Sequence, residues 1–166
     1  MKRPKYGSML VLALVAVLLT ASPAMARAQR TSFAGTASFV ESINAGEWMF
    51  LRDGSGHARG IVEVYHDVNS DPRVTGEETT TYNFNFRPAP SSPIGLAGRI
   101  QGTTHIVNDG GSWDGTWTAE VTENGEYFAR GVAHGAGGYE GLIGHWNVYS
   151  STPTGPFTLS GWILEP

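Results

Sequence analysis

The chain has 166 residues, a formal charge of −4 and no cysteine, so it can form no disulfides and has no thiol nucleophile. Cleavage after Ala26 would leave 140 residues with eight arginines, no lysine and 15 acidic residues, for a charge of −7. This balance disfavours nucleic-acid binding and gives no electrostatic support for docking on anionic lipid headgroups.

The N-terminus has the three parts of a secretory signal peptide. Lys2, Arg3 and Lys5 precede an almost wholly apolar run, Met9 to Leu19, and Ala24 and Ala26 place small side chains at the two positions that a signal peptidase recognises. The apolar run of about 11 residues is shorter than the roughly 18 to 20 that a membrane-spanning helix needs, and no later run is long enough. We therefore expect a signal peptide over 1–26 and a secreted or periplasmic location for the remainder.

The remainder, 27–166, has a suitable length for one domain. The chain holds 22 glycines, and short runs rich in Val, Ile, Thr and aromatic residues alternate with Asp-Gly, Asn-Gly and Gly-Gly turns. This pattern predicts an all-β, antiparallel, meander-like β-barrel of eight or nine strands. The predicted strands are 32–41, 47–52, 57–67, 77–87, 96–108, 113–122, 126–134, 142–149 and 157–164.

Alternation within these runs predicts which side chains face the interior. Tyr82, Phe84 and Phe86 share one face of their strand, and polar residues take the other face. Several glycines fall on the apolar phase, where tight curvature and large rings leave no room for a side chain, and this favours a small barrel over a flat sandwich. These glycines are Gly98, Gly102, Gly115, Gly144 and Gly161.

One segment carries a family resemblance. Val132 to Tyr149, VAHGAGGYEGLIGHWNVY, has the form strand, Gly-x-Gly-Gly-aromatic-Glu-Gly, apolar pair, Gly, strand. It resembles the allene oxide cyclase and dirigent-like β-barrel superfamily, in which a glycine-rich turn and an aromatic residue lead into one of the last strands. The residues in those positions are Gly135, Gly137, Gly138, Tyr139, Gly141 and Gly144.

The resemblance implies the barrel fold more than an activity. The superfamily includes plant cyclases, proteins that steer radical coupling, bacterial cyclases of natural products and many exported bacterial members. No catalytic residue is carried over, because the residue-by-residue match does not extend beyond the glycine-rich turn. The turn consists mostly of glycine, which favours a structural role, and we expect Tyr139 to plug one end of the barrel.

Several enzyme classes lack their motifs in this sequence. There is no Gly-x-Ser-x-Gly elbow, no phosphate-binding glycine loop, no dinucleotide fingerprint and no His-Glu-x-x-His. The five histidines include no His-x-His pair of the kind that metal-binding barrels place on one strand face. The sequence therefore predicts no cofactor and no metal site.

The predicted strand over 57–67 must turn a polar side chain into the barrel. Glu63 and Tyr65 share one phase and His66 takes the other, so either the first two residues or the third point inward. A polar group in a dry interior needs a partner or a purpose. The sequence alone leaves both phases open.

The predicted strand over 126–134 poses the same question. Arg130 and His134 share a phase with Phe128 and Val132. If this larger set faces inward, Arg130 and His134 are available to orient or protonate a bound molecule; the alternative is an ion pair on the outer surface. The candidate ligand-binding residues are Glu63, Tyr65, Tyr82, Arg130 and His134.

Three functions remain compatible with the sequence. The first is an exported barrel, monomeric or homodimeric, that binds a small hydrophobic ligand in its cavity with little or no catalysis. The second is a cofactor-independent isomerase or cyclase that holds a reactive small molecule. The third, which requires side chains to fill the barrel, is a structural or interaction protein of the cell envelope. The sequence nominates no catalytic residue for any of them.

Overall fold

The computed structural model describes residues 28–166, so the predicted signal peptide and its cleavage site after Ala26 lie outside the described residues. The described part contains nine β-strands and one short 3-10 helix. These elements are β1 (Gln29–Asn44), β2 (Glu47–Phe50), β3 (Gly56–Asn69), η1 (Pro72–Val74), β4 (Gly76–Pro88), β5 (Leu96–Asn108), β6 (Gly111–Val121), β7 (Tyr127–Gly137), β8 (Ile143–Ser150) and β9 (Phe157–Glu165).

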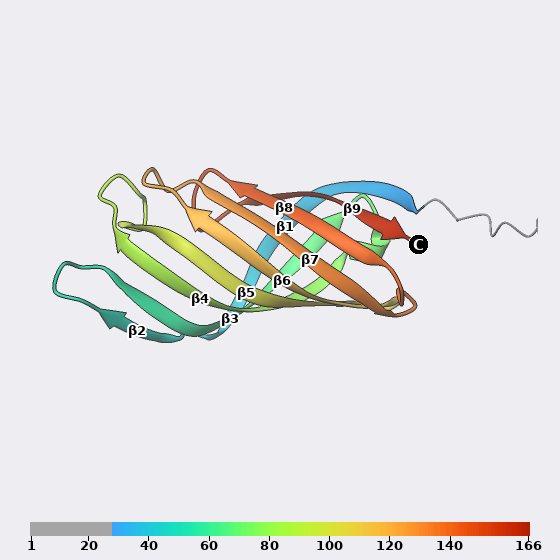
Figure 1. The fold of residues 1–166 in the computed structure, drawn as a ribbon, viewed down its shortest axis with the longest axis horizontal. Helices are drawn as coiled ribbons and strands as arrows, with labels where there is room; N and C mark the ends of the chain where they lie inside the picture. Colours follow the sequence, from blue (N-terminus) through green and yellow to red (C-terminus); the bar gives the residue numbers. More distant parts are fainter. Residues whose placement is uncertain (1–27) are drawn as a thin grey trace, which may run out of the picture.

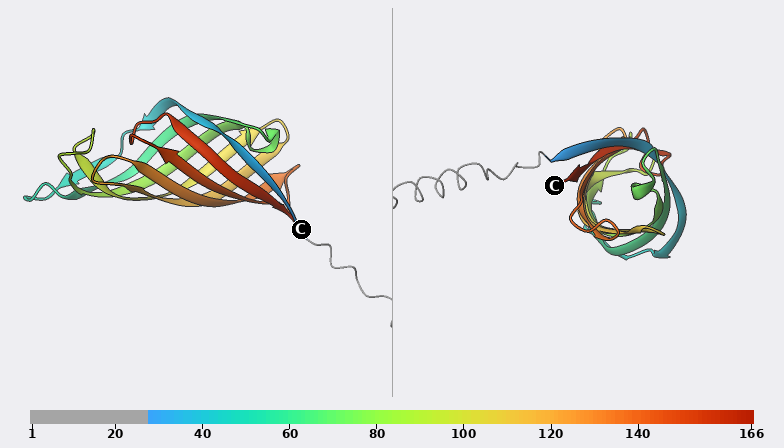
Figure 2. Two further views of the ribbon diagram at one scale, coloured as in Figure 1. Left: turned by 90° about the horizontal axis from the view of Figure 1, so that it is seen from above. Right: turned by 90° about the vertical axis from the view of Figure 1, so that its right-hand side faces the viewer.

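Eight of these strands form a closed antiparallel barrel (Figure 1). Strands β3 to β9 pair in chain order, and β1 closes the ring by pairing with β9 on one side and with β3 on the other. The closed ring is visible in the end-on view of Figure 2. The predicted all-β, meander-like barrel is confirmed.

The ninth strand, β2, lies outside the ring and pairs with residues 56–59 of β3. Trp48 and Phe50 of β2 remain largely exposed, although their rings pack on Phe86 with centroids 5.5 and 5.2 Å away. Of the two predicted strand counts, eight therefore applies to the barrel and nine to the whole sheet.

A β-bulge in β3 decides which side chains of this strand face inward. Ala58 pairs with Phe84 of β4, but the next register has Ile61 opposite Tyr82, so β3 carries one extra residue. Gly60 within the bulge has φ +67°, a backbone conformation that glycine adopts without steric cost. Beyond the bulge, every second residue from Ile61 onward faces the interior, as Ala58 does before it.

The barrel end beside the C-terminus is closed by aromatic packing. Trp113 is fully buried, its ring stacks on Tyr139 at 5.4 Å, and its Nε1 donates to the carbonyl oxygen of Arg73 at 2.7 Å. The Tyr139 hydroxyl donates to Oδ1 of Asn108 at 2.6 Å. The glycine-rich turn and η1 thus meet at this end. A second apolar cluster, which includes Phe84, Phe86, Ile100 and Val121, packs toward β2.

No helix among residues 28–166 is long and apolar enough to cross a membrane.

Candidate functional site

The barrel contains an internal cavity of about 460 Å³. Its lining includes Ile100 from one apolar cluster and Ile106 from the other, so the cavity adjoins both. Phe39 of β1 and Thr154 of the β8–β9 loop also line it, and both are exposed, which places the opening beside them. The interior is therefore not filled by side chains.

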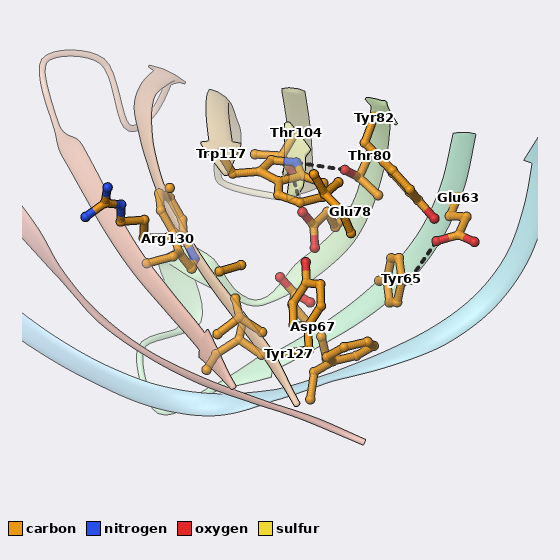
Figure 3. Close-up of a pocket in the computed structure, with 18 of the residues that line it drawn as sticks. Glu63, Tyr65, Asp67, Glu78, Thr80, Tyr82, Thr104, Trp117, Tyr127 and Arg130 are labelled. Carbon is orange, nitrogen blue, oxygen red and sulfur yellow. Dashed lines mark hydrogen bonds between the residues drawn. The ribbon is translucent and has the colours of Figure 1, made fainter. Parts of the chain in front are cut away.

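Three of the five predicted site residues face this cavity. They are Glu63, Tyr65 and Tyr82 (Figure 3). The Tyr65 hydroxyl donates to Oε2 of Glu63 at 2.7 Å. Burial raises the pKa of both tyrosines, and the nearby Glu63 carboxylate raises it further. Both phenols therefore stay protonated and are able to donate hydrogen bonds, while His66 is exposed on the outer face.

Of the two orientations that the sequence left open for Arg130 and His134, the structure has the outward one, so the inward orientation that their ligand-binding role required is not found. Both side chains are exposed, and the opposite set, Tyr127 and Ala129, faces the cavity. Figure 3 shows the Arg130 side chain pointing away from the polar groups inside, although the residue forms part of the cavity wall. Neither residue supports the predicted grip on a bound ligand.

Tyr127 and Ala129 face the cavity, and Arg130 faces outward, because two tryptophans on the neighbouring strands require space inside. Gly131 of β7 pairs with Trp117 of β6 on one side and with Trp146 of β8 on the other. Because both indoles line the cavity, the strand between them presents its small residues inward. The larger Phe128 packs outside against Tyr149, with ring centroids 5.1 Å apart.

The structure adds Asp67, which the sequence analysis did not nominate. Its side chain lines the cavity and is only 1% exposed, and neither carboxyl oxygen has a hydrogen-bond partner among the described residues. Burial, followed by the charge of Glu78, raises the pKa of Asp67 from 3.8 to about 8. At neutral pH this carboxyl group is mostly protonated and is able to donate a hydrogen bond or a proton to a bound molecule.

Glu78 of β4 is the second added acid. It faces the cavity, the Thr104 hydroxyl donates to its Oε1, and burial raises its pKa. Tyr127 also faces the cavity, and burial followed by the charges of Glu78 and Glu63 raises its pKa. The cavity thus contains three carboxyl groups and three phenols.

Strand alternation contains the signal for both added acids. Glu78 continues the phase of Tyr82, Phe84 and Phe86, two steps toward the start of β4. Asp67 lies one step beyond Tyr65 on the phase that Glu63 and Tyr65 share. Extending the predicted phase of Tyr82 to the start of its strand would have found Glu78, whereas Asp67 follows only once Glu63 and Tyr65 are known to face inward.

Three acids outside the cavity have arginine partners. Arg73 contacts Asp71 at 2.7 Å and Glu165 at 2.6 Å, and Arg87 contacts Glu123 at 2.6 Å. The acids inside the barrel form no such ion pair within residues 28–166. Nor does this part of the chain bring together three or more His, Asp or Glu side chains in an arrangement that would hold a metal ion.

The fold and the site together define a closed β-barrel with an acidic, aromatic-lined internal cavity. Comparison of the chain with protein-family models, with curated proteins and with solved structures finds no match. The resemblance to the allene oxide cyclase and dirigent-like barrels therefore stays a prediction.

Proposed function

We propose that this protein binds a small, largely hydrophobic molecule inside the barrel without catalysing a reaction on it. The observation that carries this proposal is the cavity itself. Its volume of about 460 Å³ lies within the range typical of small-molecule sites. A few polar groups are set among apolar and aromatic walls, which is the usual composition of such a site.

The aromatic walls support each other without a ligand. Phe157 packs edge-on against Tyr127 and Tyr65, with ring centroids 5.2 and 5.8 Å away, and Tyr82 packs against Trp117 at 5.6 Å. Edge-on and tilted arrangements are favourable for aromatic pairs. The cavity is therefore formed in advance, which lowers the entropic cost of binding.

The opening also suits an apolar molecule. Phe39 is 54% exposed at the rim, and its ring contacts Tyr65 inside the cavity at 5.8 Å. A continuous aromatic surface thus leads from solvent to the interior. The opposite end is closed by the packing of Trp113 on Tyr139, so we expect ligands to pass through the Phe39 side.

A neutral fluorescent probe, 1-naphthalenemethanol, tests the proposal. We expect saturable binding to residues 27–166, and at least tenfold weaker binding to Ala129→Phe, because the added ring fills the cavity. Phe128→Ala is the matched control, since its side chain lies outside on the adjacent position and does not line the cavity, and we expect unchanged affinity. Absence of saturable binding, or wild-type affinity in a folded Ala129→Phe variant, would refute the proposal.

We also propose that the protein is exported. The support is the N-terminal sequence, in which a basic segment, an apolar run and small residues before Arg27 follow each other in signal-peptide order. Mass spectrometry of protein released from expressing cells should then show an N-terminus at Arg27. An intact Met1 on membrane-bound material would contradict this proposal.

A further inference from the structure

We propose that the molecule bound in the barrel carries a protonated amine, which lies against the carboxyl groups of Asp67 and Glu78. This inference rests on the proposed function, because it specifies the chemical class of the ligand in the same cavity. The ligand class is a small organic amine with one positive charge and an apolar or aromatic body.

The first observation is the unpartnered carboxyl group of Asp67. It is 1% exposed, it lines the cavity, and neither of its oxygens accepts or donates a hydrogen bond within residues 28–166. A buried polar group without a partner lowers the stability of a fold. A ligand ammonium group beside Asp67 would supply the missing hydrogen bonds and a compensating charge.

The second observation is that, among the described residues, the ionisable groups around Asp67 are acids and phenols, with no basic side chain among them. Glu63 and Tyr65 face the cavity from β3, and their neighbours on the other strands also carry carboxyl or phenol groups. These neighbours are Glu78 and Tyr82 from β4 and Tyr127 from β7. The one cationic residue in the cavity wall, among the described residues, is Arg130, and its side chain points outward (Figure 3). A ligand cation therefore has carboxyl groups beside it in the cavity, whereas a carboxylate or phosphate there has no cationic side chain of residues 28–166 to pair with.

The walls distinguish an organic cation from a metal ion. No group of three or more ligating side chains is arranged for a metal within the described residues. Instead, the lining includes three tyrosines together with Trp117 and Trp146. Aromatic faces attract organic cations and bury the apolar body that an amine carries. The cavity thus fits a hydrophobic amine better than it fits a bare ion.

We expect the binding of an amine to release a proton from Asp67. Burial raises the pKa of Asp67 to about 8, so below that pH the free cavity holds a protonated acid. An ammonium group favours the carboxylate form, and its binding would displace the proton. We therefore expect the affinity for an amine to rise between pH 6 and pH 8, and the affinity for a neutral molecule of the same shape to stay constant.

Three naphthalene probes of nearly equal shape test the inference. They are 1-naphthalenemethylamine, which is protonated throughout this pH range, neutral 1-naphthalenemethanol and anionic 1-naphthoate. At pH 7.5 we expect the amine to bind at least tenfold more tightly than the alcohol, and the carboxylate to bind most weakly. Tenfold is the lower end of what a charge-assisted hydrogen bond contributes.

Matched variants locate the effect. Asp67→Asn and Glu78→Gln should each weaken amine binding about tenfold and change alcohol binding less than twofold. Glu77→Gln is the control, because Glu77 is the neighbouring acid on β4 and its side chain is exposed on the outer face. It should alter neither affinity.

The outcomes separate this inference from the proposed function. If the alcohol binds as tightly as the amine, the ligand class is wrong and the hydrophobic binding function stands. If none of the three probes binds, both proposals fail. If a cavity variant does not fold or also loses the alcohol, the comparison of the three probes on the unaltered protein, together with its pH dependence, decides the question.

Discussion

Trp117 and Gly102 face each other across β6 and β5, and the indole ring occupies the space that a side chain at residue 102 would need. A Cβ atom at residue 102 would lie 2.9 Å from the ring and 2.5 Å from the carbonyl oxygen of Thr81. The position of Trp117 in the cavity wall therefore depends on the absence of a side chain opposite it.

Gly102→Ala tests this dependence. We expect a loss of about 1 to 3 kcal/mol in the free energy of unfolding, the usual cost of overpacking, because backbone and ring must both shift. Urea unfolding followed by circular dichroism measures it. Thr103→Ala, at the exposed neighbouring position, is the control and should change stability by less than about 0.5 kcal/mol. Equal stability of both variants would show that the wall tolerates a side chain here.

Stability should depend on pH through Asp67. Its pKa is raised from 3.8 to about 8, so over this range the folded protein retains a proton that the unfolded chain releases. The free energy of unfolding should therefore fall as pH rises from about 4 to 8, by at most about 1.4 kcal/mol per pH unit, and then level off.

Asp67→Asn removes this titration. Urea unfolding between pH 5 and pH 9 should show a smaller fall for the variant than for the unaltered protein, and the variant should be the more stable of the two at pH 9. Parallel curves for the two proteins would show that Asp67 does not titrate in this range.

The bulge in β3 provides a prediction about backbone conformation. A Cβ atom at Gly60 would contact nothing within 4 Å, but the φ of +67° is unfavourable for residues with a side chain. Gly60→Ala should thus cost about 1 to 2 kcal/mol through backbone strain alone. Gly60→Asn should cost less, because asparagine tolerates this conformation better. Thermal unfolding compares the two, and a more stable alanine variant would contradict the argument.

The closed end of the barrel yields a further prediction. Tyr139→Phe removes the hydroxyl that donates to Asn108, and we expect a loss of about 0.5 to 1.5 kcal/mol in unfolding free energy. Tyr149→Phe is the matched control, because Tyr149 is 42% exposed on the outer face. Similar losses in both variants would indicate a general effect of removing a phenol oxygen.

The strands and their order were largely predictable from the sequence, because alternation and turn residues are local signals. The first strand is the main exception, since β1 extends over 29–44 instead of 32–41. Its N-terminal part pairs with β9 and its C-terminal part with β3, so its length depends on two partners distant in the sequence. Pairing between strands this distant in the sequence is not visible in the local residue pattern.

The side chains that face the interior were predictable only for strands whose own alternation decides the orientation. The phase of Tyr82, Phe84 and Phe86 followed from their own alternation and is confirmed by the burial of Phe84 and Phe86. Either Glu63 and Tyr65 or His66 had to face inward. The bulge at Gly60 decides between them, and the alternation of β3 alone did not reveal this bulge. The choice between an inward and an outward Arg130 depended on the space that Trp117 and Trp146 occupy, and both tryptophans lie on other strands.

Closure of the ring has a consequence for biosynthesis. The first strand of the barrel, β1, pairs with the last, β9, so Gln29 lies opposite Glu165 and the ring is incomplete until β9 has been synthesised. Until then, β1 and β8 each present an unpaired strand edge, which is a template for association with another chain. Contacts this distant in sequence also make folding slow. Nascent or truncated chains that lack residues 157–165 would therefore be the form of this protein most prone to aggregate.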